Sequence, residues 1–304
     1  MLAILIQLIL PILMIIGMGA CYRIKGLCEA SFPDDLMLLV FRVIMPITLF
    51  LDMSRLDLSH QFNSGFMLAY LVTSLVMMML AWFAFKTIFS KNKSVCFLRA
   101  IAATHTNTAF IALPIFLLTF GTSLPVILVI AIQNIFLLGY LFYLDKQSMS
   151  SSSWYTPLQN PLLIGSALGF VFHLTHLNLP QVINQTFEWI SKSTAFLALF
   201  SLGGSLYQSN VKLSQHFSKD MMLSLFLKTT IHPLLAYFIG KNLFHLKGFW
   251  LESLVLISAM PTAKLVFLLA KKYKIDQTFA NWTVLLSTIL TFIPISLILA
   301  IISR

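Results

Sequence analysis

Ten apolar runs follow one another along this chain of 304 residues, and each is close to the length needed to cross a membrane. The hydrocarbon core of a bilayer is about 30 Å thick, which takes roughly 20 helical residues. Backbone polar groups cannot stay unpaired in lipid, and these runs are too long and too uniformly apolar for barrel strands, so we expect an all-α polytopic membrane protein. The runs cover residues 2–22, 36–54, 64–89, 97–119, 124–144, 158–176, 186–206, 222–245, 250–271 and 278–302.

The charged residues are few, and their placement is informative. They make up 10% of the chain, against roughly 25% in soluble domains, which excludes a water-soluble enzyme. We therefore expect the lipid bilayer, and no nucleic acid, as the partner of this basic chain. Of its 20 Lys and Arg residues, 12 lie on the face with five loops and 5 on the face with both termini. The positive-inside rule then predicts that both termini are outside.

The most polar connection falls almost at the midpoint of the chain. It divides the sequence into a five-helix repeat at 1–144, a cytoplasmic linker at 145–157 and a second five-helix repeat at 158–304. Because each half has an odd number of spans, the second repeat would be inverted relative to the first. Pro11 and Pro161 lie in the first run of each half, although prolines are common enough in membrane helices to coincide by chance.

The fourth run of each half carries polar residues at membrane depth. In one, the stretch Thr104–Thr108 precedes Pro114; in the other, Ser258, Thr262 and Lys264 surround Pro261. Lipid does not tolerate such groups, so we expect two interrupted helices that line a cavity. The half-helix N-termini would carry partial positive charge suited to an anion.

These residues resemble a known family. The stretch from Asn107 to Pro114 followed by Phe120-Gly121 is similar to the fourth-helix signature of the auxin efflux carrier family, and other stretches agree in the same order. They are Pro46 in its Arg42–Phe50 context, Ser201–Ser205, Ala259–Thr262, Leu269-Ala270 before Tyr273, and Leu286–Thr288.

The resemblance implies two inverted five-helix repeats whose broken helices 4 and 9 cross at the substrate site, with elevator-type alternating access. It also implies transport of organic anions such as malate, malonate or auxin-like acids, a homodimer, and the bacterial inner (cytoplasmic) membrane. The chain departs from the family pattern at Lys264, where most members carry a small or apolar residue. A long cytoplasmic loop is also missing.

The candidate substrate-binding residues lie in and around the two breaks and on the helices that follow them. Asn107 can both donate and accept hydrogen bonds, so it could orient a carboxylate or satisfy the broken helix. Lys264 could pair with the substrate, take the place of a coupling cation, or extend to the cytoplasmic face. The full set is Asn107, Thr106, Pro114, Pro261, Thr262, Lys264, Asn134 and Thr288.

Four ionisable residues are candidates for coupling or gating: Lys264, Arg42, Lys228 and Asp52. Arg42 and Lys228 could instead serve helix packing or lipid headgroups. Asp52 could carry a proton or pair with Arg55 at the surface. Coupling to a proton or to sodium is open.

A secondary carrier of small organic anions is the reading we favour from the sequence. The alternatives are a membrane-embedded enzyme or a non-transporting membrane scaffold. No Walker loop or nucleophile elbow is present in the sequence, so we expect no enzyme activity. The three cysteines lack a C-x-x-C pair and a nearby histidine at zinc-ligand spacing, so we expect free thiols, no metal site and no cofactor.

Overall fold

The computed structural model describes residues 2–55, 63–89, 92–148, 159–177, 179–206 and 218–302, and within these ranges the chain is helical. The predicted linker at 145–157 lies largely outside the described residues. The helices, with π-helical segments marked η, are α1 (Leu2–Ile24), α2 (Phe32–Leu39), η1 (Val40–Ile44), α3 (Met45–Ser54), α5 (Ser64–Phe89), α6 (Lys93–Thr104), η2 (Thr108–Ala112), α7 (Leu113–Phe120), α8 (Leu124–Ser148), α9 (Pro161–Leu174), α10 (Gln181–Leu206), α11 (Lys219–Phe226), η5 (Leu227–Ile231), α12 (His232–Phe238), η6 (Ile239–Leu243), α13 (Gly248–Ala259), α14 (Leu265–Lys272), α15 (Gln277–Leu290) and α16 (Phe292–Ile302).

Among the described residues, five helical stretches are long and apolar enough to cross a membrane, and shorter apolar helices accompany them. The expected all-helical membrane protein is confirmed at this level. The five stretches are Phe32–Ser54, Ser64–Phe89, Leu124–Lys146, Lys219–Leu243 and Gln277–Leu299.

Prolines explain three of the π-helical segments. Proline has no N–H to give to the carbonyl four residues earlier, so the helix before it must rearrange. The residue directly before each proline, Met45, Leu113 or His232, donates its N–H to the carbonyl five residues earlier instead. Each of these helices thus continues past its proline with a local widening.

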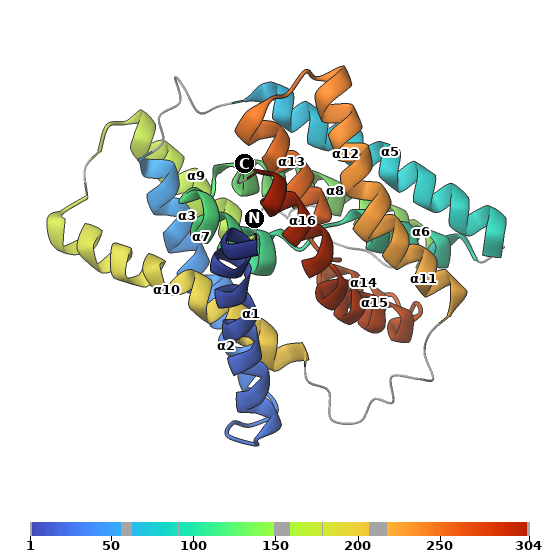
Figure 1. The fold of residues 1–304 in the computed structure, drawn as a ribbon, viewed down its shortest axis with the longest axis horizontal. Helices are drawn as coiled ribbons and strands as arrows, with labels where there is room; N and C mark the ends of the chain where they lie inside the picture. The colour runs from blue at the N-terminus through green and yellow to red at the C-terminus, as the bar shows by residue number, and fades with distance from the viewer. Residues whose placement is uncertain are drawn as a thin grey trace.

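The helices form two groups with further helices between them (Figure 1). In the first, α3 packs on α9 and α1 on α10, and α10 also contacts α2 and α3. In the second, α5 packs on α6, α12 on α13, α14 on α15, and α11 on both α6 and α15. We call the first set (α1, α2, η1, α3, α9, α10) the glycine group and the second (α5, α6, α11, η5, α12, η6, α13, α14, α15) the break group.

Glycines allow the helices of the glycine group to touch backbone to backbone. A Cβ on Gly19 would overlap the Phe200 carbonyl oxygen, and one on Gly203 would overlap that of Ile16. On the other helix pair, a Cβ on Gly165 would overlap the backbone of Pro46. Small residues at such crossings are how membrane helices pack closely.

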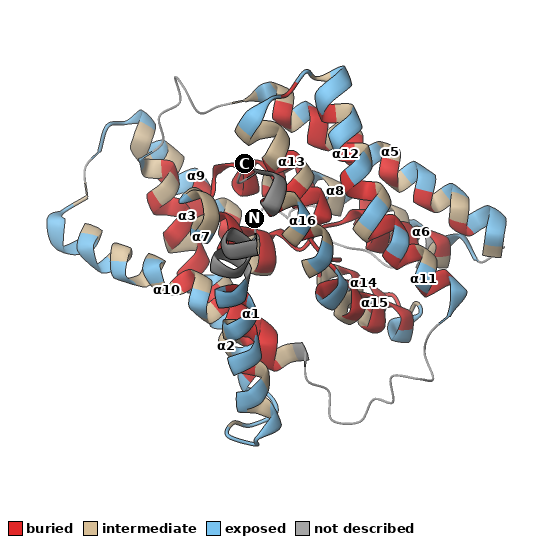
Figure 2. Ribbon diagram, viewed as in Figure 1, coloured by how far each residue is buried: buried red, intermediate tan, exposed pale blue. Residues whose placement is uncertain are grey.

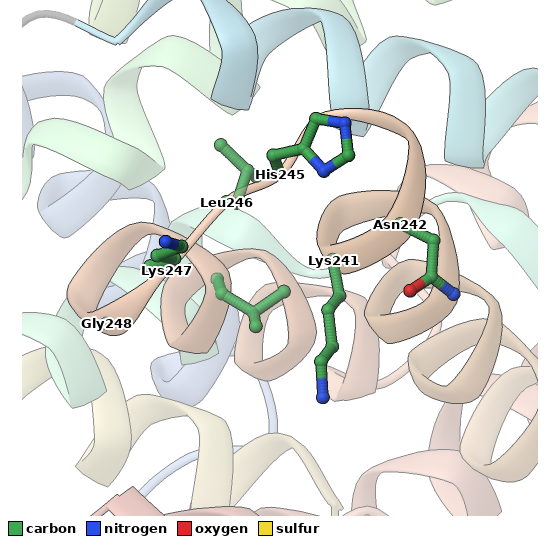
Figure 3. A pocket seen from close by; sticks show the side chains of 7 residues that line it. Lys241, Asn242, His245, Leu246, Lys247 and Gly248 are labelled. Atoms are coloured by element: carbon green, nitrogen blue, oxygen red, sulfur yellow. The ribbon is translucent and has the colours of Figure 1, made fainter.

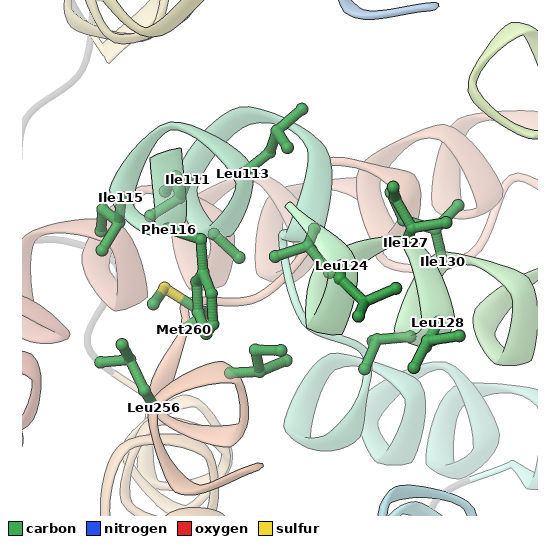
Figure 4. Packing of buried hydrophobic residues seen from close by; sticks show 14 of the residues in the cluster. Ile111, Leu113, Ile115, Phe116, Leu124, Ile127, Leu128, Ile130, Leu256 and Met260 are labelled. Carbon is green, nitrogen blue, oxygen red and sulfur yellow. The ribbon is translucent and has the colours of Figure 1, made fainter. Parts of the chain in front are cut away.

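Buried residues lie at the centre of the molecule and where helices pack within each group, and the outer faces of the helices are exposed (Figure 2). The exposed faces carry large apolar residues such as Met79, Phe83 and Phe142, as lipid-facing helices do. At the centre, α7 packs against α13, with Phe116 beside Met260 (Figure 4). The half-helix after the first break is therefore held in the main apolar core.

Candidate functional site

Both predicted interruptions are present, and they are hydrogen-bonded to each other. Between α6 and η2 and between α13 and α14 the chain is extended, and Thr106 and Thr262 form an isolated antiparallel bridge. The Asn107 amide donates to the Pro261 carbonyl at 2.8 Å, and the Ala263 amide donates to the His105 carbonyl at 3.1 Å. Each break thus satisfies part of the backbone that the other leaves open.

Side chains from two other helices complete the first break. The Gln133 side-chain amide, on α8, donates to the Thr106 hydroxyl at 2.6 Å, to the Thr106 carbonyl at 3.1 Å and to the Tyr70 hydroxyl at 3.0 Å. Its oxygen accepts from the Thr108 hydroxyl at 2.8 Å. All four residues are buried, so α5 and α8 hold the extended segment in one conformation.

The second break has its own polar support. The Thr262 amide donates to the Ser287 hydroxyl of α15 at 3.1 Å, and the Thr262 hydroxyl donates to the Ala102 carbonyl of α6 at 2.8 Å. The Thr291 hydroxyl donates to the Ala259 carbonyl, at the end of α13. The end of one half-helix is therefore bound by the opposite break.

Asn107 caps the half-helix that starts after the first break. Its side-chain oxygen accepts from the Phe110 amide at 3.2 Å. Within the described residues its Nδ2 has no hydrogen-bond partner, although the residue is only 5% exposed. The break therefore presents an amide donor beside the positive end of a half-helix dipole.

Lys228 lies at the carbonyl end of α6. Its side chain is 0% exposed, and its ammonium donates to the Thr104 carbonyl at 3.2 Å. The other recorded contact is with Nδ1 of His232, at 3.1 Å. The lipid-headgroup alternative for Lys228 is wrong, because the side chain is enclosed by protein.

Lys264 has a partner that the sequence did not indicate. It is the N-cap residue of α14, and its ammonium lies 2.7 Å from a carboxylate oxygen of Asp34, at the start of α2. The two side chains are 37% and 68% exposed. Its charge is thus compensated across the boundary between the break group and the glycine group, away from the interior of the crossing.

Asp52 and Arg55 do not form the expected pair with each other. Asp52 accepts a hydrogen bond from the Ser123 hydroxyl, in the connection between α7 and α8. Arg55 contacts Glu188 at 2.6 Å and Asn184 at 2.7 Å, both on α10. The predicted surface pair of Asp52 with Arg55 is therefore wrong, because Arg55 pairs with Glu188 of α10 instead.

The other candidates are scattered. Pro114 is buried at the second position of α7, and Thr288 donates only to the Val284 carbonyl of its own helix. Asn134 donates to the Ile130 carbonyl and accepts from Asn160, the cap of α9. Arg42 is exposed in η1, and among the described residues it has no hydrogen bond or ion pair. The structure brings together Thr106, Asn107, Pro261 and Thr262 from the predicted set.

Sequence reasoning missed Tyr70 and Ser287, which contact the breaks directly. Tyr70 is one polar ring in a long apolar run, which carries no particular signal. Ser287 is next to the predicted Thr288, so the helix was identified but not the side that faces the break. The three cysteines are not joined in disulfides, as expected.

Arg99, one of the 12 basic residues that we assigned to the face with five loops, is buried in a helix. Arg99 lies in α6, and its guanidinium forms ion pairs with Asp220 of α11 and with Asp276, the cap of α15, the latter at 2.6 Å. It also lies 4.6 Å above the Phe279 ring. Arg99 therefore connects three helices of the break group rather than marking the cytoplasmic surface.

A surface hollow of about 510 Å³ lies at the connection between η6 and α13. Its lining includes Lys241, Asn242, His245 and Lys247, all exposed. Figure 3 shows the Lys241 and His245 side chains pointing in different directions. The hollow does not gather its polar groups around one point, unlike the breaks.

Comparison with known proteins relates the chain to transporters. A family model described as membrane transport protein matches residues 145–299. The chain is 24% identical over 303 residues to an uncharacterized transporter of Methanocaldococcus jannaschii, and the match covers 96% of each chain. It is 23% identical over 132 residues to a protein of Rhizobium meliloti named "Putative malonate transporter", covering 43% of this chain and 40% of that protein.

Proposed function

Because the chain belongs to the membrane transport protein family, the family of the auxin efflux carriers, we propose that it is a secondary active carrier of small organic anions. The substrates would be malate, malonate or related carboxylates, or auxin-like acids. As a transporter it is an integral membrane protein. The observation that carries the anion proposal is the free side-chain amide of Asn107 at the start of a half-helix.

The chemistry of the first break supports a carboxylate ligand. Asn107 uses its side-chain oxygen for the helix cap, which leaves Nδ2 as a donor toward a ligand. The half-helix η2–α7 adds partial positive charge at the same end. Thr106, Pro261 and Thr262 would form the wall of the site, and the bridge between the breaks fixes their backbones.

The packing pattern supports two inverted repeats of five helices, 1–144 and 158–304. In such a repeat, span 6 (α9) corresponds to span 1 (α1), and span 7 (α10) corresponds to span 2 (α2, η1 and α3). If span 1 packs against span 7, a twofold axis that relates the halves therefore requires span 6 to pack against span 2. These are the close pairs α1 with α10 and α9 with α3. The hydroxyls of Thr48 and Thr194, on spans 2 and 7, lie 2.6 Å apart, and the Thr106–Thr262 bridge likewise joins corresponding spans.

Alternating access would proceed by movement of the break group against the glycine group, in the elevator manner. Two polar contacts cross toward the glycine group at opposite ends of the continuous span formed by α2, η1 and α3. They are Lys264 with Asp34 and Ser123 with Asp52. We propose that these contacts break and reform as the carrier changes conformation, which gives Lys264 and Asp52 gating roles. Arg42, exposed on the same span, is a third candidate for gating.

Two further assignments rest on the family resemblance: we propose a homodimer in the bacterial inner membrane. The proposal that both termini are outside rests on the distribution of Lys and Arg along the sequence. The match to a protein named for malonate supports a dicarboxylate as the first substrate to test.

The test is uptake of labelled malonate, malate and indole-3-acetate into proteoliposomes by wild type, Asn107→Asp and Thr119→Val. Aspartate caps helices as well as asparagine does, but it replaces the free amide donor with negative charge. We expect Asn107→Asp to lose at least about tenfold in uptake, the effect of losing a hydrogen bond to a charged ligand, with little change in melting temperature.

Thr119→Val is the matched control, because the Thr119 hydroxyl, on the same half-helix, donates only to the Ile115 carbonyl. It should transport at the wild-type rate. Equal uptake by wild type and Asn107→Asp would remove Asn107 from the site. Failure of the folded wild type to transport any of these acids would contradict the anion proposal.

A further inference from the structure

Lys228 is a buried lysine without a carboxylate beside it. Its side chain is 0% exposed, and no carboxylate of the described residues lies within 4 Å of its amino group. A positive charge in such surroundings is costly unless the neighbouring groups favour it. The neighbours are the Thr104 carbonyl at 3.2 Å and Nδ1 of His232 at 3.1 Å.

The position of the ammonium explains how it is stabilised. α6 ends at Thr104, and the last carbonyls of a helix have no partner within it and carry partial negative charge. Several other carbonyls at this break are already hydrogen-bonded. Ala102 accepts from Thr262, His105 from the Ala263 amide and Thr106 from Gln133. The Thr104 carbonyl accepts its hydrogen bond from the ammonium of Lys228.

The second break differs at the equivalent point. The last residue of α13 is Ala259, and its carbonyl accepts from the neutral hydroxyl of Thr291. A cation is therefore present at one half-helix end and absent at the other among the described residues. The charge is not a general requirement for ending a helix in this fold.

The imidazole of His105, which directly follows Thr104, is another titratable group at this end of α6. Nδ1 of His105 and Nε2 of His232 are both buried without a hydrogen-bond partner among the described residues. The surroundings of Lys228 are therefore carbonyl and imidazole groups, which are ligands suited to a small cation.

We propose that the Lys228 ammonium is a built-in cation that occupies the place of a coupling metal ion at the carbonyl end of α6. The carrier would then transport without sodium, and the fixed charge would offset the substrate anion bound at the start of η2–α7. This inference rests on the proposed function, and it assigns to Lys228 the cation-replacing role that the sequence suggested for Lys264.

The experiment measures melting temperature of the purified full chain in chloride salts of equal ionic strength. The cations are choline as a bulky reference, sodium, potassium and n-propylammonium. Lys228→Ala removes three methylene groups and the ammonium, which n-propylammonium restores. Lys241→Ala is the matched control, since Lys241 is exposed on the same span and contacts only Tyr237.

We expect the melting temperature of wild type to be the same in all four salts. Lys228→Ala should melt at least about 4 °C lower in choline, because the Thr104 carbonyl and His232 lose their donor, and n-propylammonium should recover about half of that loss. Lys241→Ala should show neither effect. In proteoliposomes, wild-type uptake should be equal with and without sodium.

Three results would overturn the proposal. They are stabilisation of wild type by sodium over choline, a sodium requirement for uptake, and a Lys228→Met variant that takes up substrate at the wild-type rate without sodium. Methionine fills the same space without charge, so uptake by this variant tests the charge itself even where Lys228→Ala does not fold. The melting measurements need no substrate. They therefore test the role of Lys228 even if the proposal of an organic anion as the substrate fails.

Discussion

Two neighbouring hydroxyls on α15 make different contacts. Ser287 accepts from the Thr262 amide at the second break, whereas Thr288 donates to the Val284 carbonyl of its own helix. Ser287→Ala would leave a buried amide unpaired, so we expect it to lower the free energy of unfolding by about 1–3 kcal/mol. Thr288→Val should change it by less than about 0.5 kcal/mol. Thermal unfolding in detergent compares the two variants, and equal effects would show that the Ser287 contact contributes nothing.

The same pair shows where sequence reasoning stops at the residue scale. Polar residues at membrane depth located both breaks, because lipid excludes such groups whatever the fold around them. Choosing between Ser287 and Thr288 needs the rotation of a helix, which tertiary packing sets. Lys228 and Lys264 were likewise both visible as charges in apolar runs. Only the fold shows that Lys228 is enclosed and that Lys264 meets Asp34.

Close helix packing provides the prediction at the element scale. Gly19 and Gly17 lie on the same helix, but a Cβ on Gly19 would overlap the Phe200 backbone, and one on Gly17 would meet nothing within 4 Å. Gly19→Ala should therefore cost at least about 3 kcal/mol of stability by separating α1 from α10. Gly17→Ala should be neutral or stabilising by up to about 1 kcal/mol, the helix preference of alanine. A lower melting temperature for Gly17→Ala than for Gly19→Ala would contradict the packing described here.

Arg99 gives a second prediction about elements. It is buried between Asp220 and Asp276, so Arg99→Leu would leave a buried carboxylate without its cation. We expect a loss of about 3–5 kcal/mol, as for one broken partner of a buried pair. Adding Asp220→Asn should recover part of the loss, because the buried carboxylate that paired with Arg99 is then replaced by a neutral amide. No recovery in the double variant, measured by thermal unfolding, would mean that Arg99 acts through packing alone.

The elements themselves were largely predictable, and their irregularities were not. The apolar runs and the polar gaps at Thr104–Thr108 and around Pro261 follow directly from the exclusion of polar groups by lipid. Proline disturbs a helix, as Pro46, Pro114 and Pro233 do, but the sequence does not say whether the helix breaks or widens. The helices before these prolines widen, while the interruptions form upstream of Pro114 and at Pro261, where the other break supplies hydrogen bonds.

At the scale of the whole molecule, the proposed alternating access depends on relative movement of two groups of helices. The ion pair of Lys264 and Asp34 joins them, with its atoms 2.7 Å apart. The ion pair of Arg55 and Glu188 lies within the glycine group, with its atoms 2.6 Å apart and its side chains 51% and 36% exposed. The two pairs are similar in length and accessibility, so they can be compared by the same chemical cross-link.

The most direct test replaces each pair by two cysteines in a background without Cys21, Cys28 and Cys96, and measures uptake before and after a short thiol cross-linker is added. For Asp34→Cys with Lys264→Cys, we predict that cross-linking abolishes uptake and that cleaving the linker restores it. For Arg55→Cys with Glu188→Cys, uptake should be unchanged by cross-linking. Full uptake by the cross-linked Asp34→Cys and Lys264→Cys variant would contradict movement of the break group against the glycine group.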